Sequence, residues 1–143
     1  MVEQSFPIPV VRIIITDAAG RVLIVKRDST THSRGSWCLP GGKVDYGETV
    51  LQAAAKELFE ETALECEAME FLFYQDSPPP DPGEMHCINF YFECENEGDI
   101  VLNKESSAYA WIGPEDLDKY PIAFLNDLGL KLYWAEKGLA VNS

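Results

Sequence analysis

Three glutamates at helical spacing are the residues of this sequence best suited to chemistry. Glu57, Glu60 and Glu61 stand at positions i, i+3 and i+4, so a helix would bring their carboxylates into one cluster. Like charges so close repel one another, and a bound divalent cation relieves the repulsion. Mg²⁺ suits this role because it prefers oxygen ligands and binds one or two carboxylates together with water and substrate phosphate. Taken alone, the cluster fits a merely acidic helix face better than a magnesium site, and the loop that precedes the helix is what shifts the interpretation toward a metal site.

The helix that must position these glutamates is predicted to begin after Thr49. Thr49 can cap the helix, and Gln52 can return a hydrogen bond to the backbone of the cap, as in a capping box. Helical periodicity places the glutamates beside a buried face that consists of Val50, Leu51, Ala54, Ala55 and Leu58. Ala63 is expected to end the helix in the left-handed conformation, where alanine costs about 1 kcal/mol relative to glycine.

A glycine-rich loop, residues 39–49, runs directly into this helix. Gly41 and Gly42 allow a backbone path that other residues cannot follow, so that a carbonyl can approach a metal ion or a phosphate closely. Lys43 follows them and is a candidate contact for a diphosphate, although an exposed loop lysine fits the pattern equally well. Arg27 ends a predicted strand, and it either reaches substrate phosphate or is only an exposed charge.

The loop and the helix together resemble the signature of the Nudix hydrolases, Gly-x5-Glu-x7-Arg-Glu-U-x-Glu-Glu-x-Gly-U, where U is a bulky aliphatic residue. The match begins at Gly42, continues through Glu48 and the three helix glutamates, and ends at Leu64. Two positions depart from the signature, because Lys56 replaces Arg and Ala63 replaces Gly. Lysine keeps the positive charge but lacks the planar fork with which arginine holds a carboxylate by two bonds.

This resemblance implies hydrolysis of a phosphoanhydride bond in a small nucleoside diphosphate-linked compound, either a nucleoside triphosphate or an ADP-ribose-like substrate. The implied cofactor is Mg²⁺, with Mn²⁺ as an alternative ion. Its implied ligands are the carboxylates of Glu57, Glu60 and Glu61 and the backbone carbonyl of Gly41, with Gly42 as the second choice for the carbonyl.

The resemblance also implies roles in the reaction itself. Glu60 is the first candidate for the general base and Glu105 the second, and Glu57 belongs to the same catalytic set. Arg27 and Lys43 are the expected contacts for substrate phosphate. The alternative is a non-catalytic nucleotide-binding or sensor module with the same fold. Such members usually lose signature glutamates, and all four are present here, which favours an enzyme.

Length and charge restrict the partners of this chain. Its 143 residues suit a single domain, residues 1–143. The net charge of −13 disfavours long nucleic acids, whereas a small phosphorylated substrate remains compatible because a bound cation dominates the field locally. No stretch has the roughly 18 apolar residues of a membrane span or the pattern of a signal peptide, so we expect a cytoplasmic protein without a membrane partner. The sequence does not determine the oligomeric state, and a homodimer is compatible with it.

The four cysteines form no Cys-x-x-Cys pair. If Cys87 and Cys94 share one strand, they lie roughly 23 Å apart, beyond the reach of a disulfide. We therefore predict reduced, mostly buried thiols and no zinc site.

The resemblance implies an α/β fold, a Nudix-type α/β/α sandwich whose mixed sheet is flanked by helices. The residue pattern predicts a hairpin of residues 10–16 and 21–27, and strands over 65–76, 86–94 and 107–112, of which 86–94 is central. Pro114 is expected to open a short helix. A C-terminal helix is expected over residues 122–137, packed on the sheet through Leu125, Leu128, Leu132 and Tyr133.

Overall fold

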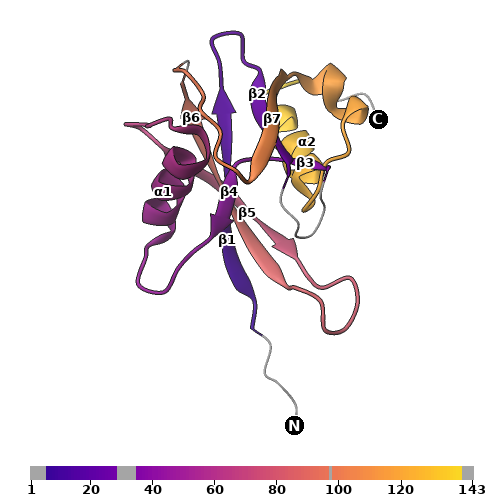
Figure 1. Cartoon of the computed structure of the whole chain (residues 1–143). Helices are drawn as coiled ribbons and strands as arrows, with labels where there is room; N and C mark the ends of the chain where they lie inside the picture. Colours follow the sequence, from indigo (N-terminus) through magenta and orange to yellow (C-terminus); the bar gives the residue numbers. More distant parts are fainter. Residues whose placement is uncertain (1–5, 29–34, 97, 140–143) are drawn as a thin grey trace.

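A mixed β-sheet forms the centre of the computed structural model, which describes residues 6–28, 35–96 and 98–139 (Figure 1). Within these residues the sheet has seven strands in the order β3-β2-β1-β6-β5, with β4 paired to β1 and β7 paired to β2. Their bounds are β1 (Ile8–Thr16), β2 (Val22–Arg27), β3 (Trp37–Cys38), β4 (Gly41–Lys43), β5 (Glu70–Ser77), β6 (Cys87–Glu95) and β7 (Ser106–Ile112). The helices are α1 (Val50–Thr62), the 3₁₀ helix η1 (Pro114–Lys119) and α2 (Asn126–Glu136).

β1 lies at the centre because it pairs with three other strands. It runs antiparallel to β2 and β4 and parallel to β6. Its β-branched residues are buried on both faces of the sheet, as expected for a strand covered from both sides. Val11, Ile13 and Ile15 belong to the core under α1, whereas Ile14 belongs to the opposite core.

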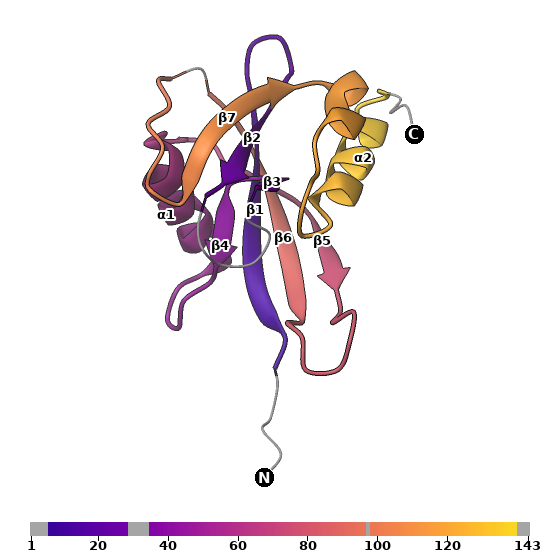
Figure 2. The same cartoon turned by 45° about the vertical axis from the view of Figure 1, so that its right-hand side comes forward.

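The two long helices cover opposite faces of the sheet (Figure 1 and Figure 2). Ala54 and Leu58 of α1 pack on the first core, and Leu130 and Trp134 of α2 pack on the second. The α/β/α sandwich implied by the signature is therefore confirmed. None of the helices in the described residues is long and apolar enough to cross a membrane.

Several local predictions are confirmed. The hairpin joins β1 to β2, and β6 lies between β1 and β5. The side chain of Thr49 accepts a hydrogen bond from the Gln52 backbone N–H at 3.1 Å, and the Gln52 side chain accepts one from the Thr49 N–H at 2.9 Å. Ala63 ends α1 in the left-handed conformation with φ of 64°. Pro114 opens η1.

The predicted start of the last helix is wrong. Residues 122–125 lie beside β3, where the Trp37 N–H donates to the Pro121 carbonyl and the Trp37 carbonyl accepts from Ala123. Two left-handed residues, Phe124 and Leu125, then turn the chain into α2, which begins at Asn126. The predicted packing face is also wrong apart from Tyr133: the exposed residues are Leu125, Leu128 and Leu132, and the buried apolar ones include Leu130 and Trp134.

Two further boundaries differ from the predictions. In α1 the buried face is rotated about the helix axis relative to the predicted one, since Ala53 is buried while Leu51 and Ala55 are exposed. The strand expected from residue 65 begins at Glu70, because residues 63–69 connect α1 to the sheet without strand pairing.

The prediction of reduced thiols is wrong for two cysteines. Cys66 and Cys94 form a disulfide, with their Cα atoms 6.2 Å apart. Cys66 follows the end of α1, and Cys94 points from β6 into the core beneath that helix. The packing of α1 on the sheet therefore brings together two residues 28 positions apart. Cys38 and Cys87 are free.

Candidate active site

Two of the three signature glutamates on α1 turn toward the protein. Glu61 is only 7% exposed and Glu57 is partly buried, whereas Glu60 is exposed. The carboxyl groups of Glu57 and Glu61 hydrogen-bond to each other. Burial, together with this hydrogen bond and the Glu57 charge, raises the pKa of Glu61 to about 9, and burial also raises the pKa of Glu57. Without a cation the pair holds a proton that ordinary carboxyl groups would release at neutral pH.

The glycine loop packs directly on this carboxyl pair. The Gly41 N–H donates to Oε2 of Glu61 at 3.3 Å. A β-carbon on Gly41 would lie 1.9 Å from the carbonyl oxygen of Val11, so only glycine fits where β4 pairs with β1. Gly41 is thus required where β4 approaches β1, and it brings a backbone N–H next to the Glu61 carboxylate.

Lys56 ties the loop to the helix. Its Nζ lies 2.7 Å from Oδ2 of Asp45 and 2.8 Å from Oε2 of Glu48. The other Glu48 oxygen accepts a hydrogen bond from the Asp45 N–H at 2.8 Å. Hydrogen bonds to Asp45 and Glu48 hold the pKa of Lys56 above its usual range. Lysine in the arginine position of the signature therefore bridges two carboxylates, one on the loop and one just before the helix.

Glu105 lies within electrostatic range of the Glu57 and Glu61 carboxyl groups. It precedes β7, and its backbone carbonyl accepts a hydrogen bond from the Asp28 N–H at 2.9 Å. Its charge contributes to the raised pKa of both Glu57 and Glu61, and the charge of Glu60 contributes to that of Glu57. The fold thus brings Glu60, Glu61 and Glu105 into electrostatic range of Glu57.

The two predicted phosphate contacts lie at the ends of strands. Lys43 is exposed at the end of β4. Arg27 ends β2, and its guanidinium lies 4.8 Å from the centre of the Phe124 ring.

The acidic side chains do not form a complete cage for a metal ion. Across residues 6–28, 35–96 and 98–139, no three His, Cys, Asp or Glu side chains gather as a metal-binding group. Mg²⁺, however, is usually held by one or two carboxylates and keeps its other positions for water and phosphate. The close pair of Glu57 and Glu61 beside the glycine backbone has the right donor chemistry for such an ion.

Sequence reasoning missed a polar network on the α2 side of the sheet. Gln75 accepts hydrogen bonds from Asn89 and from the Tyr91 hydroxyl, each at 2.9 Å, and donates to the Leu125 carbonyl at 2.9 Å. Asn126 accepts from the Leu39 N–H at 2.9 Å and donates to the Phe124 carbonyl at 3.2 Å. The network also includes Arg12, and a charged residue within a β-branched strand was the one sequence signal that could have pointed to it.

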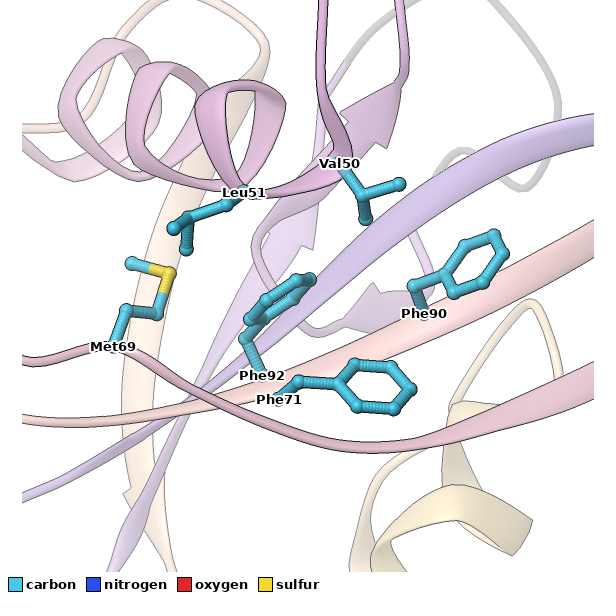
Figure 3. A pocket seen from close by; sticks show the side chains of 6 residues that line it. All are labelled: Val50, Leu51, Met69, Phe71, Phe90 and Phe92. Carbon is cyan, nitrogen blue, oxygen red and sulfur yellow. The ribbon is translucent and has the colours of Figure 1, made fainter.

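An apolar cavity of about 490 Å³ lies at the beginning of α1, against β5 and β6 (Figure 3). Figure 3 shows its lining side chains, which are Val50, Leu51, Met69, Phe71, Phe90 and Phe92. These side chains carry no titratable group, so this cavity offers no acid or base for hydrolysis.

Comparisons with known proteins agree with this architecture. The family model described as the NUDIX domain matches residues 7–129. The nucleoside triphosphatase NudI of Escherichia coli O81 (strain ED1a) is 32% identical over 97 residues, which are 62% of this chain and 69% of that protein.

Two solved structures share the fold. The MutT protein from Methanosarcina mazei Go1 has a TM-score of 0.81 at 21% identity, and the match covers 96% of this chain and 99% of the MutT chain. The NUDIX domain of Shewanella oneidensis NrtR, solved with ADP ribose, has a TM-score of 0.74 at 20% identity, and the match covers 94% of this chain and 90% of the NrtR chain. At these identities the likeness supports the fold alone.

Proposed function

The chain belongs to the Nudix hydrolase family, and from this premise we propose that it hydrolyses a phosphoanhydride bond of a small nucleotide with Mg²⁺, or Mn²⁺, as its cofactor. The preferred substrate class is a nucleoside triphosphate, because NudI is named as a nucleoside triphosphatase. An ADP-ribose-like compound is the second candidate, because the NrtR domain binds ADP ribose.

The observation that carries this proposal is the contact between the carboxyl pair and the glycine loop. Glu61 is buried and Glu57 beside it is partly buried, and the Gly41 N–H contacts Glu61 at 3.3 Å. Two buried carboxylates are costly in a folded protein unless they are protonated or bind a cation. A site that only needed a solvated acidic face would not bury them.

Each residue then has a defined part in the reaction. When bound, the cation neutralises charge on the phosphoryl oxygens and makes a water molecule more acidic. Glu57 and Glu61 would hold it, together with the Gly41 carbonyl and Glu60 as further ligands. Glu60 is exposed and can accept a proton from the attacking water, and Glu105 is the second candidate for this step. Lys43 and Arg27 would bind the outer phosphates.

A substrate panel tests the proposal most directly. Nucleoside triphosphates and ADP-ribose are incubated with the protein in Mg²⁺, in Mn²⁺ and in excess EDTA, and the release of phosphate, pyrophosphate or nucleoside monophosphate is measured. We expect turnover of at least one nucleotide with either ion and none in EDTA. Glu60→Gln should lower kcat by about 10²- to 10⁴-fold if Glu60 is the base, while Glu105→Gln should have the smaller effect.

Glu136→Gln serves as the matched control, because Glu136 is an exposed glutamate at the end of α2, on the opposite face of the sheet. It should leave turnover unchanged. If the wild-type protein keeps its secondary structure and turns over none of the nucleotides, the non-catalytic binding module becomes the better description. The single-domain organisation, the cytoplasmic location and a homodimer stay predictions.

A further inference from the structure

Arg12 is a buried cation that is poorly satisfied by the residues that the structure describes. It lies in β1, is only 8% exposed, and faces the α2 side of the sheet. Its Nη1 donates one long hydrogen bond, 3.4 Å, to the Leu39 carbonyl, and its Nε has no hydrogen-bond partner within residues 6–28, 35–96 and 98–139. Among the described residues it takes part in no ion pair within 4.0 Å. A buried guanidinium in this state destabilises the fold, so its presence calls for a ligand.

A second arginine converges on the same place. The guanidinium of Arg12 lies 4.7 Å from the centre of the Phe124 ring, and that of Arg27 lies 4.8 Å from it. Arg12 is also the cross-strand partner of Gly41, the residue whose N–H contacts Glu61. In a chain with a net charge of −13, two arginine side chains therefore contact the same aromatic ring.

The ring between these arginines is held in place by a strained turn. Phe124 and Leu125 have φ of 62° and 59°, a conformation that costs non-glycine residues free energy. Asn126 donates to the Phe124 carbonyl and Gln75 donates to the Leu125 carbonyl, so side-chain amides fix both residues of the turn. Strain that is held by dedicated hydrogen bonds is common where a protein binds a ligand.

We propose that Arg12 is a substrate-binding residue that contacts a phosphate oxygen of the nucleotide, with Arg27 and Phe124 completing the same subsite. This inference rests on the proposed function, because it places one substrate phosphate on the α2 side of the Gly41 backbone. A phosphate is favoured over a neutral base because the buried Arg12 guanidinium, with a second guanidinium on the same ring, matches an anion.

The test compares Arg12→Met with Arg12→Lys and measures binding without turnover. Isothermal titration calorimetry with nucleoside monophosphates and with the parent nucleosides is done in EDTA and again in Mg²⁺. We expect the wild-type protein to bind a monophosphate at least tenfold more tightly than its nucleoside. Arg12→Met should lose this preference and Arg12→Lys should keep part of it. Arg21→Met is the control, since Arg21 pairs with Asp17 in the exposed β1–β2 turn.

Thermal unfolding of the ligand-free protein separates binding from a structural role. Removing an unpaired buried charge should leave the melting temperature of Arg12→Met equal to or above that of wild type. A lower melting temperature together with unchanged monophosphate preference would show that Arg12 is structural and would overturn the proposal. So would a wild-type protein that binds monophosphate and nucleoside equally in both conditions. Neither result depends on turnover, which tests the proposed function separately.

Discussion

Gly42 lies so close to Glu57 that a β-carbon on the glycine would be 2.6 Å from Cδ and 2.8 Å from both carboxylate oxygens. The carboxylate that the signature assigns to the metal therefore rests on the backbone of the residue with which the signature begins. This contact links the loop to the helix more directly than sequence spacing could show.

Gly42→Ala should displace the Glu57 carboxylate and lower kcat/KM by tenfold or more, because small displacements of catalytic groups are costly. Steady-state kinetics with the best substrate of the panel measure the loss. Glu57→Asp provides the control, since its shorter side chain withdraws from the glycine. If the contact is as described, the kcat/KM of the Gly42→Ala/Glu57→Asp double variant is little lower than that of Glu57→Asp alone. If the losses in kcat/KM of the two single variants simply multiply in the double variant, the contact is contradicted.

The stability of the metal-free protein should fall as the pH rises through the neutral range. The pKa of Glu61 is about 9 in the folded protein, against an ordinary value of 4.5. Between these values the folded state keeps a proton that the unfolded chain has released, so the free energy of unfolding decreases with pH, by up to about 1.4 kcal/mol per pH unit.

Urea unfolding in EDTA at a series of pH values measures this slope. Glu61→Gln cannot release the proton, so its slope should be flatter than that of wild type. Saturating Mg²⁺ should also flatten the slope, because the ion replaces the proton. An identical slope in wild type and Glu61→Gln would mean that another group is responsible.

Ala63→Gly should stabilise the protein by about 0.5–1 kcal/mol, because Ala63 ends α1 with φ of 64° and glycine adopts this conformation without a steric cost. Chemical denaturation measures the gain. Ala135→Gly in the last turn of α2 is the matched control, and it should be destabilising because Ala135 has a helical backbone. A loss of stability at both positions would refute the assignment of the left-handed cap.

Reduction of the disulfide should lower stability, because Cys66 and Cys94 join the end of α1 to β6. Cross-links of this kind typically contribute about 2–4 kcal/mol. We expect dithiothreitol to lower the urea midpoint of the wild-type protein. The urea midpoint of Cys66→Ser should be the same with and without dithiothreitol. Cys87→Ser, which removes a free thiol, should keep the response to dithiothreitol. A wild-type protein that is insensitive to the reductant would contradict the linkage.

Local sequence patterns predicted the elements whose signals are short-range. Thr49 and Gln52 form the capping box, Ala63 adopts the left-handed cap, and Pro114 opens η1, because each depends on residues within one turn. Helical spacing also predicted glutamates that border the buried face of α1, which holds for Glu57 and Glu61, whereas Glu60 is exposed. The family signature, which covers only residues 42–64, supplied the fold of the whole sheet.

Longer-range features could not be obtained in this way. The segment 122–125 has helical periodicity, but its backbone pairs with Trp37 of β3, and no local pattern contains that contact. The disulfide was missed for the same reason, since only the packing of α1 on the sheet brings Cys66 to Cys94.

The sequence by itself determined which residues we propose for the chemistry: four glutamates and a pair of glycines, from their spacing along a loop and a helix. The tertiary structure alone decided which of them share a proton, because the burial of Glu61 depends on how α1 rests against β4. It also decided that Arg12, an ordinary strand residue in the sequence, contacts the same Phe124 ring as Arg27. Spacing along the chain fixes neighbours within a few residues, whereas burial and charge depend on which distant segments close around them.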